Sequence, residues 1–268
     1  MQIIDYEKGH GNAGTFQIIC RNCDSNYFSN YESENALLSG PTNMMLAEIA
    51  LKNHLMVLSK RYHEVELYEL LNTELSEIEG KEILDSIHAF DIRDEQFQFK
   101  RCKKIIDKQL KSGYSIIFYD LLDYVIPIAV QTPIALHHDL NYGIVNDIYN
   151  SSEDATMRDA HLAIFPLSEK TIILFFCHRD DRNYYKFHRQ FQKLEHQMQL
   201  QMINYYIFKY SENYMLSPGI DRSIIKNKAL QTLSREVGDI GDLGFIDPYK
   251  KKKAIAPDEI PNFLTLKK

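Results

Sequence analysis

The chain has 268 residues, of which 25% are charged and 44% are hydrophobic. This length can bury a core as one large domain or two small ones, and the composition of an ordinary globular protein excludes wholesale disorder. The formal net charge of −6 argues against a surface that is basic throughout and coats nucleic acid, although a local basic patch stays compatible with it.

The first residues, MQIIDYEKGHGNAG, contain neither a basic opening nor an apolar run of signal-peptide length. No later run reaches the roughly eighteen apolar residues that a membrane span needs. We therefore expect a cytoplasmic protein that does not contact a membrane. In that compartment its four cysteines are expected to be reduced thiols or metal ligands, and they are Cys20, Cys23, Cys102 and Cys177.

Residues 1–40 are predicted to form a zinc-knuckle module. The segment TFQII at residues 15–19 has the composition of a strand, and the C-x-x-C pair Cys20 and Cys23 follows it. Two thiolates separated by two residues at a tight turn can bind one zinc ion together. Asp24 and Ser25 are then placed to cap a helix.

The zinc prediction is incomplete, because a structural zinc site needs four ligands and no second Cys or His pair follows at conventional spacing. His10 is the candidate third ligand, and His54 or His63 could supply a fourth only through the fold. The latter two are nine positions apart on a predicted helix, where we expect both to be partly exposed. A lone C-x-x-C is also compatible with buried structural thiols or with redox chemistry, and these alternatives stay open.

Residues 41–112 are predicted to be helical. Apolar residues recur at near-helical spacing from Pro41 to about Leu75, which predicts one or two long helices. A second amphipathic pattern, with a cysteine on its inner face, runs from Asp94 to Lys111. The segment between them, Lys81 to Phe90, fits either a short helix or a strand.

Residues 114–178 are predicted to form a sheet. Three runs concentrate Ile, Val, Phe and Tyr, namely SIIFYDLLDYVIPIAV, PIALHHDLNYGIVNDIY and HLAIFPLSEKTIILFF. The third run is the clearest hairpin, with its turn at residues 166–170. Pro127 and Pro133 interrupt the other runs, so we expect edge strands or strand ends there, because proline cannot donate a ladder hydrogen bond.

Two histidines and a carboxylate follow the strand end predicted at residues 131–133. His137, His138 and Asp139 are consecutive, and such side chains at strand ends can bind a divalent ion or act as general acid and base. Their spacing matches no defined catalytic signature. They are the candidate catalytic residues, with the alternative that they are ordinary loop residues.

An apolar stripe over residues 184–210 predicts a helix against the sheet, and residues 220–237 predict a last helix. The tail, with glycines, prolines and four consecutive lysines, is expected to be loosely structured. The predicted fold class is α+β: an N-terminal strand–knuckle–helix, a helical region, and a central mixed or antiparallel sheet packed by C-terminal helices. The predicted parts are the module 1–40, a main domain 41–218, and the helix and tail 219–268.

The block FQIICRNCDSNYFSNYE at Phe16–Glu32 resembles an opening found in uncharacterised bacterial proteins, in which C-x-x-C and an acidic residue precede Phe and Tyr-Glu. Those proteins often carry an earlier His-Ile-Ile-Pro segment, which suggests a remote likeness to His-Asn-His nucleases. In this chain His10 is followed by Gly-Asn-Ala-Gly, so the histidine segment is not reproduced.

Three further segments are similar to a bacterial family known only as a domain of unknown function. They are Gln131–Pro133, Phe165–Ser168, and Ile203-Asn204 before Tyr210-Ser211. Some members of that family occur among anti-phage defence genes. The resemblance implies a defence-like role and supplies no established reaction.

Two classes of function follow. The first is a metal-dependent nuclease acting on DNA or RNA, with a structural zinc and a second, catalytic divalent ion. Its zinc ligands would be Cys20, Cys23 and His10, and its catalytic residues His137, His138 and Asp139. The second is a non-catalytic binding or sensing protein, in which the zinc knuckle stabilises an arm and a protein partner or a second copy of the chain docks. The acidic balance favours the second class, and the defence-gene resemblance favours the first. The hypothesis from the sequence is the first class, a defence-like protein with metal-dependent nuclease activity, and the binding protein is the alternative.

Overall fold

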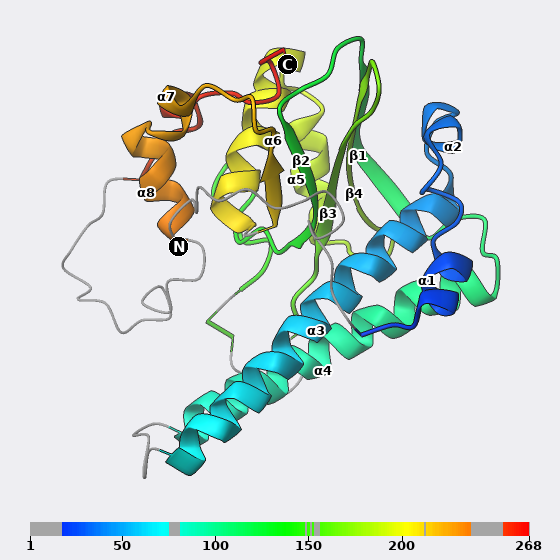
Figure 1. The fold of residues 1–268 in the computed structure, drawn as a ribbon, viewed down its shortest axis with the longest axis vertical. Helices are drawn as coiled ribbons and strands as arrows, with labels where there is room; N and C mark the ends of the chain where they lie inside the picture. Colours follow the sequence, from blue (N-terminus) through cyan, green and yellow to red (C-terminus); the bar gives the residue numbers. More distant parts are fainter. Residues whose placement is uncertain are drawn as a thin grey trace. The chain divides into compact units, whose positions relative to one another are not determined.

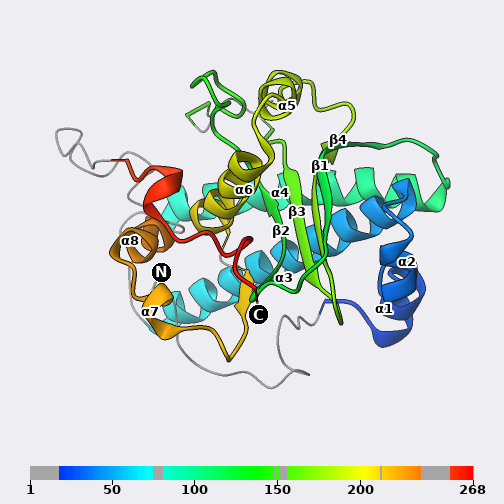
Figure 2. The ribbon, with the colours of Figure 1, turned by 90° about the horizontal axis from the view of Figure 1, so that it is seen from above.

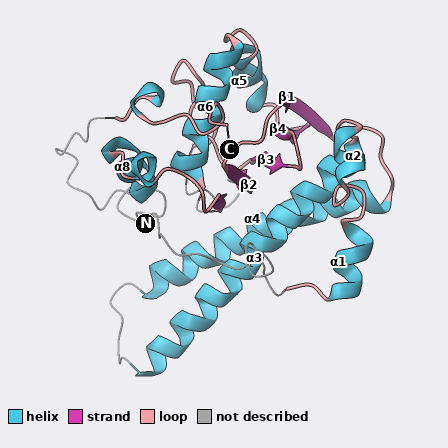
Figure 3. Cartoon of the chain, turned by 45° about the horizontal axis from the view of Figure 1, so that its top comes forward, coloured by secondary structure: helices cyan, strands magenta, loops and turns pink. Residues whose placement is uncertain are grey.

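The computed structural model describes residues 18–74, 81–147, 149–150, 152, 156–211, 213–236 and 254–267, apart from the side chains of 71–74 and 81–87. It divides into two compact units, one within Thr15–Tyr114 and one within Ser115–Lys268. We call them the helical unit and the sheet unit, since helices make up the first and the strands gather in the second (Figure 3). The division near Tyr114 differs from the boundaries expected after residues 40 and 218.

The helical unit is built on two long helices, α3 (Asn43–Glu74) and α4 (Lys81–Asp107). They run side by side as an antiparallel hairpin (Figures 1 and 2). The helix predicted from residue 41 to about 75 is confirmed, whereas 81–107 is one helix and not two elements. The sequence pattern predicts that a new helix begins at Asp94. Contacts with α3 keep α4 continuous through this residue, because tertiary packing overrides local propensity. None of the described helices has the length and apolar character required to span a bilayer.

Two short helices precede the hairpin, α1 (Arg21–Tyr27) and α2 (Glu34–Leu38). The chain between them buries the rings of Phe28 and Tyr31. Lys52 on α3 places its Nζ 4.7 Å from the centroid of the first ring and 5.8 Å from that of the second. This cation–π contact and the burial of both rings hold the N-terminal segment on α3, which explains why residues up to 40 belong to the helical unit.

The sheet unit contains a five-stranded antiparallel sheet with the strand order β1-β4-β3-β2-β5. The strands are β1 (Tyr114–Leu122), β2 (Ile128–Ile134), β3 (Ala160–Pro166), β4 (Thr171–His178) and β5 (Tyr214–Leu216). In the central ladder Val130 lies opposite Ile164, and Leu162 lies opposite Phe175. The antiparallel alternative and the predicted hairpin are both confirmed.

Pro127 and Pro133 lie at the ends of strands, as the sequence predicts. β2 pairs with β3 from Val130 to Ile134 but with β5 only as far as Val130. Pro133 therefore lies beyond the β5 pairing, where the missing N–H removes no bond to that strand. Pro127 immediately precedes β2, and its carbonyl accepts a hydrogen bond from the Ser217 N–H at 2.8 Å.

Two helices cover one face of the sheet, α5 (Tyr184–Phe191) and α6 (His196–Tyr210) (Figures 1 and 2). The ring of Phe175 on β4 contacts Phe187 on α5 and Tyr206 on α6, with centroid distances of 5.8 and 6.2 Å. In one continuous helix these two residues would be about 28 Å apart along the axis. The chain must therefore turn between them, which explains why the helix predicted over 184–210 is two helices.

The C-terminal part contains α7 (Arg222–Ile225), α8 (Lys228–Glu236) and, after residues that are not described, the segment 254–267. Phe263 and Leu264 of that segment are completely buried in the core of the sheet unit. The segment therefore differs from the loosely structured tail expected from its composition, because Ile260, Phe263 and Leu264 are buried in the core.

Asn204 on α6 fixes the C-terminal segment. Its Oδ1 accepts a hydrogen bond from the Phe263 N–H, and its Nδ2 donates to the Pro261 carbonyl, each at 3.0 Å. The short 3-10 helix η3 (Pro257–Glu259) precedes this attachment. Because the Asn204 side chain is completely buried, both backbone groups depend on it for their partners.

Asn204→Ala should lower the free energy of unfolding by about 2 kcal/mol, because it leaves the buried Phe263 N–H and the partly buried Pro261 carbonyl without this partner. Urea denaturation followed by circular dichroism measures the change. Met198→Ala, at a side chain that is 49% exposed on the same helix, is the matched control and should stay within about 0.5 kcal/mol of the wild type. Equal stability of the two variants would contradict this account of Asn204.

Candidate functional site

Cys20 and Cys23 lie at the start of α1 and are both accessible. The first is exposed, the second is partly exposed, and both are free thiols. Cys20 is the N-cap residue of α1, and its Sγ accepts a hydrogen bond from the backbone N–H of Cys23 at 3.4 Å. The two thiols therefore share one helical turn, and the alternative of two buried structural thiols is wrong.

The hydrogen bonds between the two cysteines make their thiols unequal. The backbone N–H of Cys23 lowers the pKa of Cys20, because it stabilises the thiolate. The side-chain hydrogen bond to Cys20, followed by the negative charge of that thiolate, raises the pKa of Cys23. Cys20 is therefore the first of the pair to ionise and the stronger candidate to bind a metal first.

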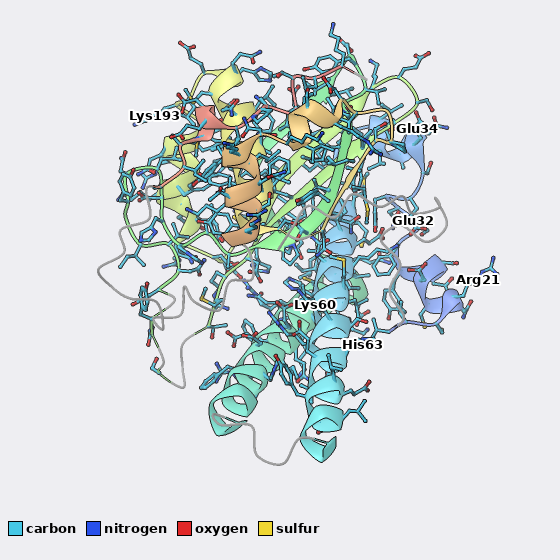
Figure 4. The ribbon with its side chains drawn as sticks, turned by 60° about the vertical axis from the view of Figure 1, so that its left-hand side comes forward. Arg21, Glu32, Glu34, Lys60, His63 and Lys193 are labelled. Atoms are coloured by element: carbon cyan, nitrogen blue, oxygen red, sulfur yellow. The ribbon has the colours of Figure 1, made fainter. Side chains whose placement is uncertain are left out.

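The predicted zinc-knuckle module is only partly described. His10 and the first part of the predicted strand lie outside the described residues, so the candidate third ligand has no position. Ile18 and Ile19 form a bend and not a strand. The helix begins at Arg21, before Asp24, because the first cysteine already provides the cap. Arg21 points away from α3 (Figure 4), in line with an accessible start of α1.

The segment after the cysteine turn is attached to α3 through charged groups. Glu48 is buried, and its Oε2 accepts a hydrogen bond from the Asn30 N–H at 3.1 Å; burial raises the pKa of Glu48. Lys52 Nζ lies 2.8 Å from Glu32 (labelled in Figure 4) and 3.4 Å from Asp24. The cysteine turn is thus held close to a long, regular helix.

The three candidate catalytic residues follow β2 and meet different surroundings. The His137 ring packs edge-on against the Tyr210 ring, with centroids 5.4 Å apart. His138 is exposed and pairs through its backbone with Ile144. Asp139 is buried. Although the three residues are adjacent in the sequence, they therefore lie in three different environments.

The Asp139 carboxylate stabilises the loop that contains it. Its Oδ1 accepts hydrogen bonds from the N–H groups of Asn141 and Gly143, at 2.9 and 2.8 Å, and its Oδ2 lies 2.9 Å from Lys186 Nζ. Burial by itself would raise the pKa of Asp139, but Lys186 and the two N–H groups outweigh it and lower this pKa to about 2. A Cβ added at Gly143 would lie 2.6 Å from Oδ2, so the turn requires glycine there.

Asn146 and Tyr184, which no sequence pattern singles out, stabilise this loop through hydrogen bonds. The Asn146 side chain donates to the carbonyls of Leu136 and Arg158 and accepts from the Arg158 N–H, each at 2.9 Å. The Tyr184 hydroxyl donates to the same Arg158 carbonyl at 2.8 Å. Neither contact has a local sequence signal, because each joins residues at least ten positions apart.

In the helical unit, α3 and α4 bring together a histidine, a carboxylate and a thiol. His54 is 1% exposed, and its Nδ1 lies 2.8 Å from Glu95 Oε2. Cys102, two helical turns after Glu95 on α4, is 3% exposed, and its sulfur accepts a hydrogen bond from the Tyr114 hydroxyl at 3.2 Å. The expectation that His54 is partly exposed is therefore wrong, whereas His63, labelled on α3 in Figure 4, is exposed as expected.

The facing sides of the hairpin carry a row of charged and polar groups. Burial by itself would lower the pKa of His54, but Glu95 and Cys102 outweigh it and raise this pKa well above its ordinary value. About two helical turns further along α3, Arg61 places its Nε 3.1 Å from Asp91 on α4, and burial raises the pKa of Asp91. The hairpin thus contains a polar seam where apolar residues are more usual.

Part of this constellation has a sequence signal. Glu95 and Cys102 are seven positions apart, so they lie on the same stripe of a helix. The inward position of Cys102 follows from the amphipathic pattern of residues 94–111. The meeting with His54 does not follow, because it depends on how α3 and α4 are aligned along each other.

Among the described residues, no third ligand joins Cys20 and Cys23, and no cluster of metal ligands forms at residues 137–139. Within each unit taken alone, the described residues place no three His, Cys, Asp or Glu side chains with ligand atoms all within 4.8 Å of one another. The Cys20–Cys23 pair is therefore half of a zinc site, and its remaining ligands stay a prediction. The catalytic ion predicted at residues 137–139 also stays a prediction.

Comparison of the chain with protein-family models, with curated proteins and with solved structures finds no match.

Asp139→Asn tests the structural role of this carboxylate through its pH dependence. The folded state lowers the pKa of Asp139 from an unfolded value of about 4 to about 2. Its contribution to stability is therefore present above about pH 4 and is lost as the pH falls toward about 2. We expect the variant to be less stable than the wild type at neutral pH, with a difference that shrinks over this interval in urea denaturation.

Asp123→Asn is the control, because Asp123 is 87% exposed and forms a surface ion pair with Lys170. Such a pair contributes little, so this variant should follow the wild type throughout. A stability difference for Asp139→Asn that stays constant down to about pH 2 would contradict the proposed link to its ionisation.

Proposed function

We propose that this chain is a zinc-binding protein that acts by binding a protein partner, and that Cys20 and Cys23 supply two thiolate ligands to a structural zinc ion. The observation that carries the proposal is the accessible pair of thiols on one helical turn, with the pKa of Cys20 lowered. Zinc is bound by thiolates, so a thiol that ionises readily favours its binding. His10 remains the candidate third ligand.

Two observations support a binding function over hydrolysis at residues 137–139. The only carboxylate of that segment, Asp139, already receives an ion pair and two backbone hydrogen bonds, so a catalytic cation would have to displace them. The long hairpin also exposes large apolar side chains that a partner could cover. They are Leu67 and Leu70 on α3 and Phe90 and Phe97 on α4.

A metal-dependent nuclease of a defence-like kind is the second candidate. The observation in its favour is His138, an exposed histidine beside a loop that Asn146 and Tyr184 brace. A histidine in a fixed position can act as a general base on a water molecule that attacks a phosphodiester. This candidate ranks second because Asp139 contributes no free ligand to an ion.

The zinc proposal predicts about one zinc ion per chain in protein purified without a metal-binding tag. The Cys20→Ser/Cys23→Ser variant should lose it, because a hydroxyl is a poor zinc ligand at neutral pH. Elemental mass spectrometry on freshly reduced protein gives the ratio. Cys177→Ala, which removes a buried thiol from β4, should keep the wild-type zinc content. Metal-free wild-type protein, or a zinc content in the double variant equal to that of the wild type, would contradict the proposal.

The nuclease candidate predicts cleavage of DNA or RNA that a chelator stops and that His138→Ala reduces by about 100-fold, the usual effect of losing a general base. Labelled single-stranded and double-stranded substrates with Mg²⁺, Mn²⁺ or Zn²⁺ are the assay. His63→Ala, at an exposed histidine of the helical unit, is the control and should cleave as the wild type does. The absence of cleavage under all of these conditions would eliminate this candidate and leave the binding function standing.

A further inference from the structure

We propose that the loop of residues 139–146 and the outer side of α5 form a surface that binds a single-stranded nucleic acid. Exposed tyrosine rings on this surface stack on the bases, and arginine and lysine side chains contact the phosphates. The surface lies within the sheet unit and uses neither the Cys20–Cys23 pair nor cleavage at His138. It therefore stands or falls independently of the zinc and nuclease proposals.

The loop is fixed along one side of α5. Asn183, at the N-cap of the helix, donates to the Val145 carbonyl at 2.9 Å. Gln190, near the other end, accepts a hydrogen bond from the Leu140 N–H at 2.9 Å. Lys186, between them, pairs with the buried carboxylate of the loop. Positions three and four residues apart share one side of a helix, so the loop lies beside α5 along its length (Figure 2).

This fixed loop exposes two large side chains. Tyr142 is 88% exposed and Ile144 is 68% exposed. Tyr142 also has a φ of 61°, a left-handed conformation that costs energy in residues other than glycine and is tolerated best by asparagine and aspartate. Stability alone would therefore favour another residue at this position. A tyrosine ring held there in solvent is expected to serve an interaction.

The outer side of α5 carries positive charge. Arg182, Lys186, Arg189 and Lys193 follow one another at spacings of four, three and four residues, and all four are exposed. This spacing places them in one stripe along the helix and the turns at its two ends. Residues 182–194 contain no Asp or Glu. The chain as a whole is acidic, so the stripe is a local basic patch.

The stripe lies between two sets of exposed rings and apolar groups. Each residue of a helix is turned by about 100° from the one before it, so Tyr185 lies on one side of the stripe. Asn183 and Gln190, which hold the loop, lie on the other side. Tyr185 is 45% exposed. Lys193, labelled in Figure 4, follows the last turn of α5.

This combination of groups selects a single-stranded nucleic acid. Proteins that bind single strands combine cations along the phosphates with aromatic rings that stack on successive bases. An acidic peptide would use the cations and leave the tyrosine rings without a role. A membrane would take up apolar side chains, and Ile144 is the only aliphatic one among the exposed side chains that define this surface. A duplex hides the faces of its bases, so the rings favour an unpaired strand.

The test measures fluorescence anisotropy of a labelled oligo-dT or oligo-U strand of about 12 nucleotides on addition of the full chain. We expect binding of a single strand that weakens as salt rises, and weaker binding of a duplex of the same length. Electrophoresis of the recovered strand checks that it stays intact. Binding of the duplex as tight as that of the single strands would overturn the proposal.

The contribution of the ring is tested by Tyr142→Asn. This variant should bind the single strand about 10-fold more weakly, because one stacking contact is lost. The loop should keep its shape, since asparagine accepts the left-handed conformation. Tyr119→Ala, at a ring that is 38% exposed on β1, is the control and should bind as the wild type does. Wild-type affinity of Tyr142→Asn would overturn the proposal.

The contribution of the cations is tested by Arg189→Ala/Lys193→Ala. Each phosphate contact that is lost should reduce the slope of log affinity against log salt by about 0.7, so the pair should reduce it by about 1.4. Lys226→Ala/Lys228→Ala removes the same charge from two other exposed lysines of the sheet unit and should keep the wild-type slope. Equal slopes in the two double variants would contradict the proposed phosphate contacts.

Two further measurements distinguish other partners. An oligo-glutamate peptide of the same charge should displace the labelled strand less well than an unlabelled strand does, because it has no bases to stack. Equal displacement would overturn the proposal in favour of an acidic protein partner. Binding to vesicles of phosphatidylserine and phosphatidylcholine, with no binding of any oligonucleotide, would overturn it in favour of a membrane surface.

Discussion

The sheet unit depends on the ring of Phe175, where one strand and two helices meet. Phe187 and Phe191 on α5 and Tyr206 on α6 all have ring centroids within about 6 Å of it. The two helices must be separate to reach the same ring, and their positions determine the rest of the unit. Tyr184, at the start of α5, then reaches the Arg158 carbonyl and braces the loop that contains the candidate catalytic residues. The position of that loop therefore follows from apolar packing on the sheet and not from any interaction among its own histidines.

The helical unit is organised by the opposite principle, because its two long helices meet through polar groups as well as apolar ones. The apolar residues of α3 near its start, including Leu46 and Ile49, are buried, but the seam further along contains His54 and Arg61 opposite carboxylates. A mostly buried pair such as His54 and Glu95 adds little net stability, although removing one partner is costly because it leaves a charge alone, whereas Arg61 and Asp91 are about one third exposed. They do fix the alignment of the two helices, since each pair forms in one register only. That alignment is what brings Glu95 to within 2.8 Å of the His54 ring.

Periodicity in the sequence was sufficient for the fold class, α3, the central hairpin and the strand ends at Pro127 and Pro133, because each depends on local patterns of apolar residues and proline. It was insufficient where one distant contact decides the outcome. The division of residues 184–210 into two helices depends on Phe175, and the burial of Phe263 depends on Asn204. The same limit applied to the sites. Asp139 stands beside two histidines in the sequence, yet its partners are Lys186 and backbone N–H groups. Cys102 stands alone in the sequence, yet the fold places the Tyr114 hydroxyl 3.2 Å from its sulfur.

The four cysteines show how one side chain acquires different chemistry from its surroundings. Cys20 and Cys23 are accessible, and the hydrogen bond between them assigns the thiolate to the first, but no described histidine of the helical unit joins them in a three-ligand cluster. Cys102 is buried in the helical unit and accepts a hydrogen bond from the Tyr114 hydroxyl, whereas Cys177 belongs to the apolar core of the sheet unit. Zinc bound by the first two would withdraw the accessible thiols from reaction with electrophiles, because a coordinated thiolate is a weaker nucleophile than a free one. Zinc binding at the first pair would therefore leave the two buried thiols, Cys102 and Cys177, as the uncoordinated cysteines of the chain.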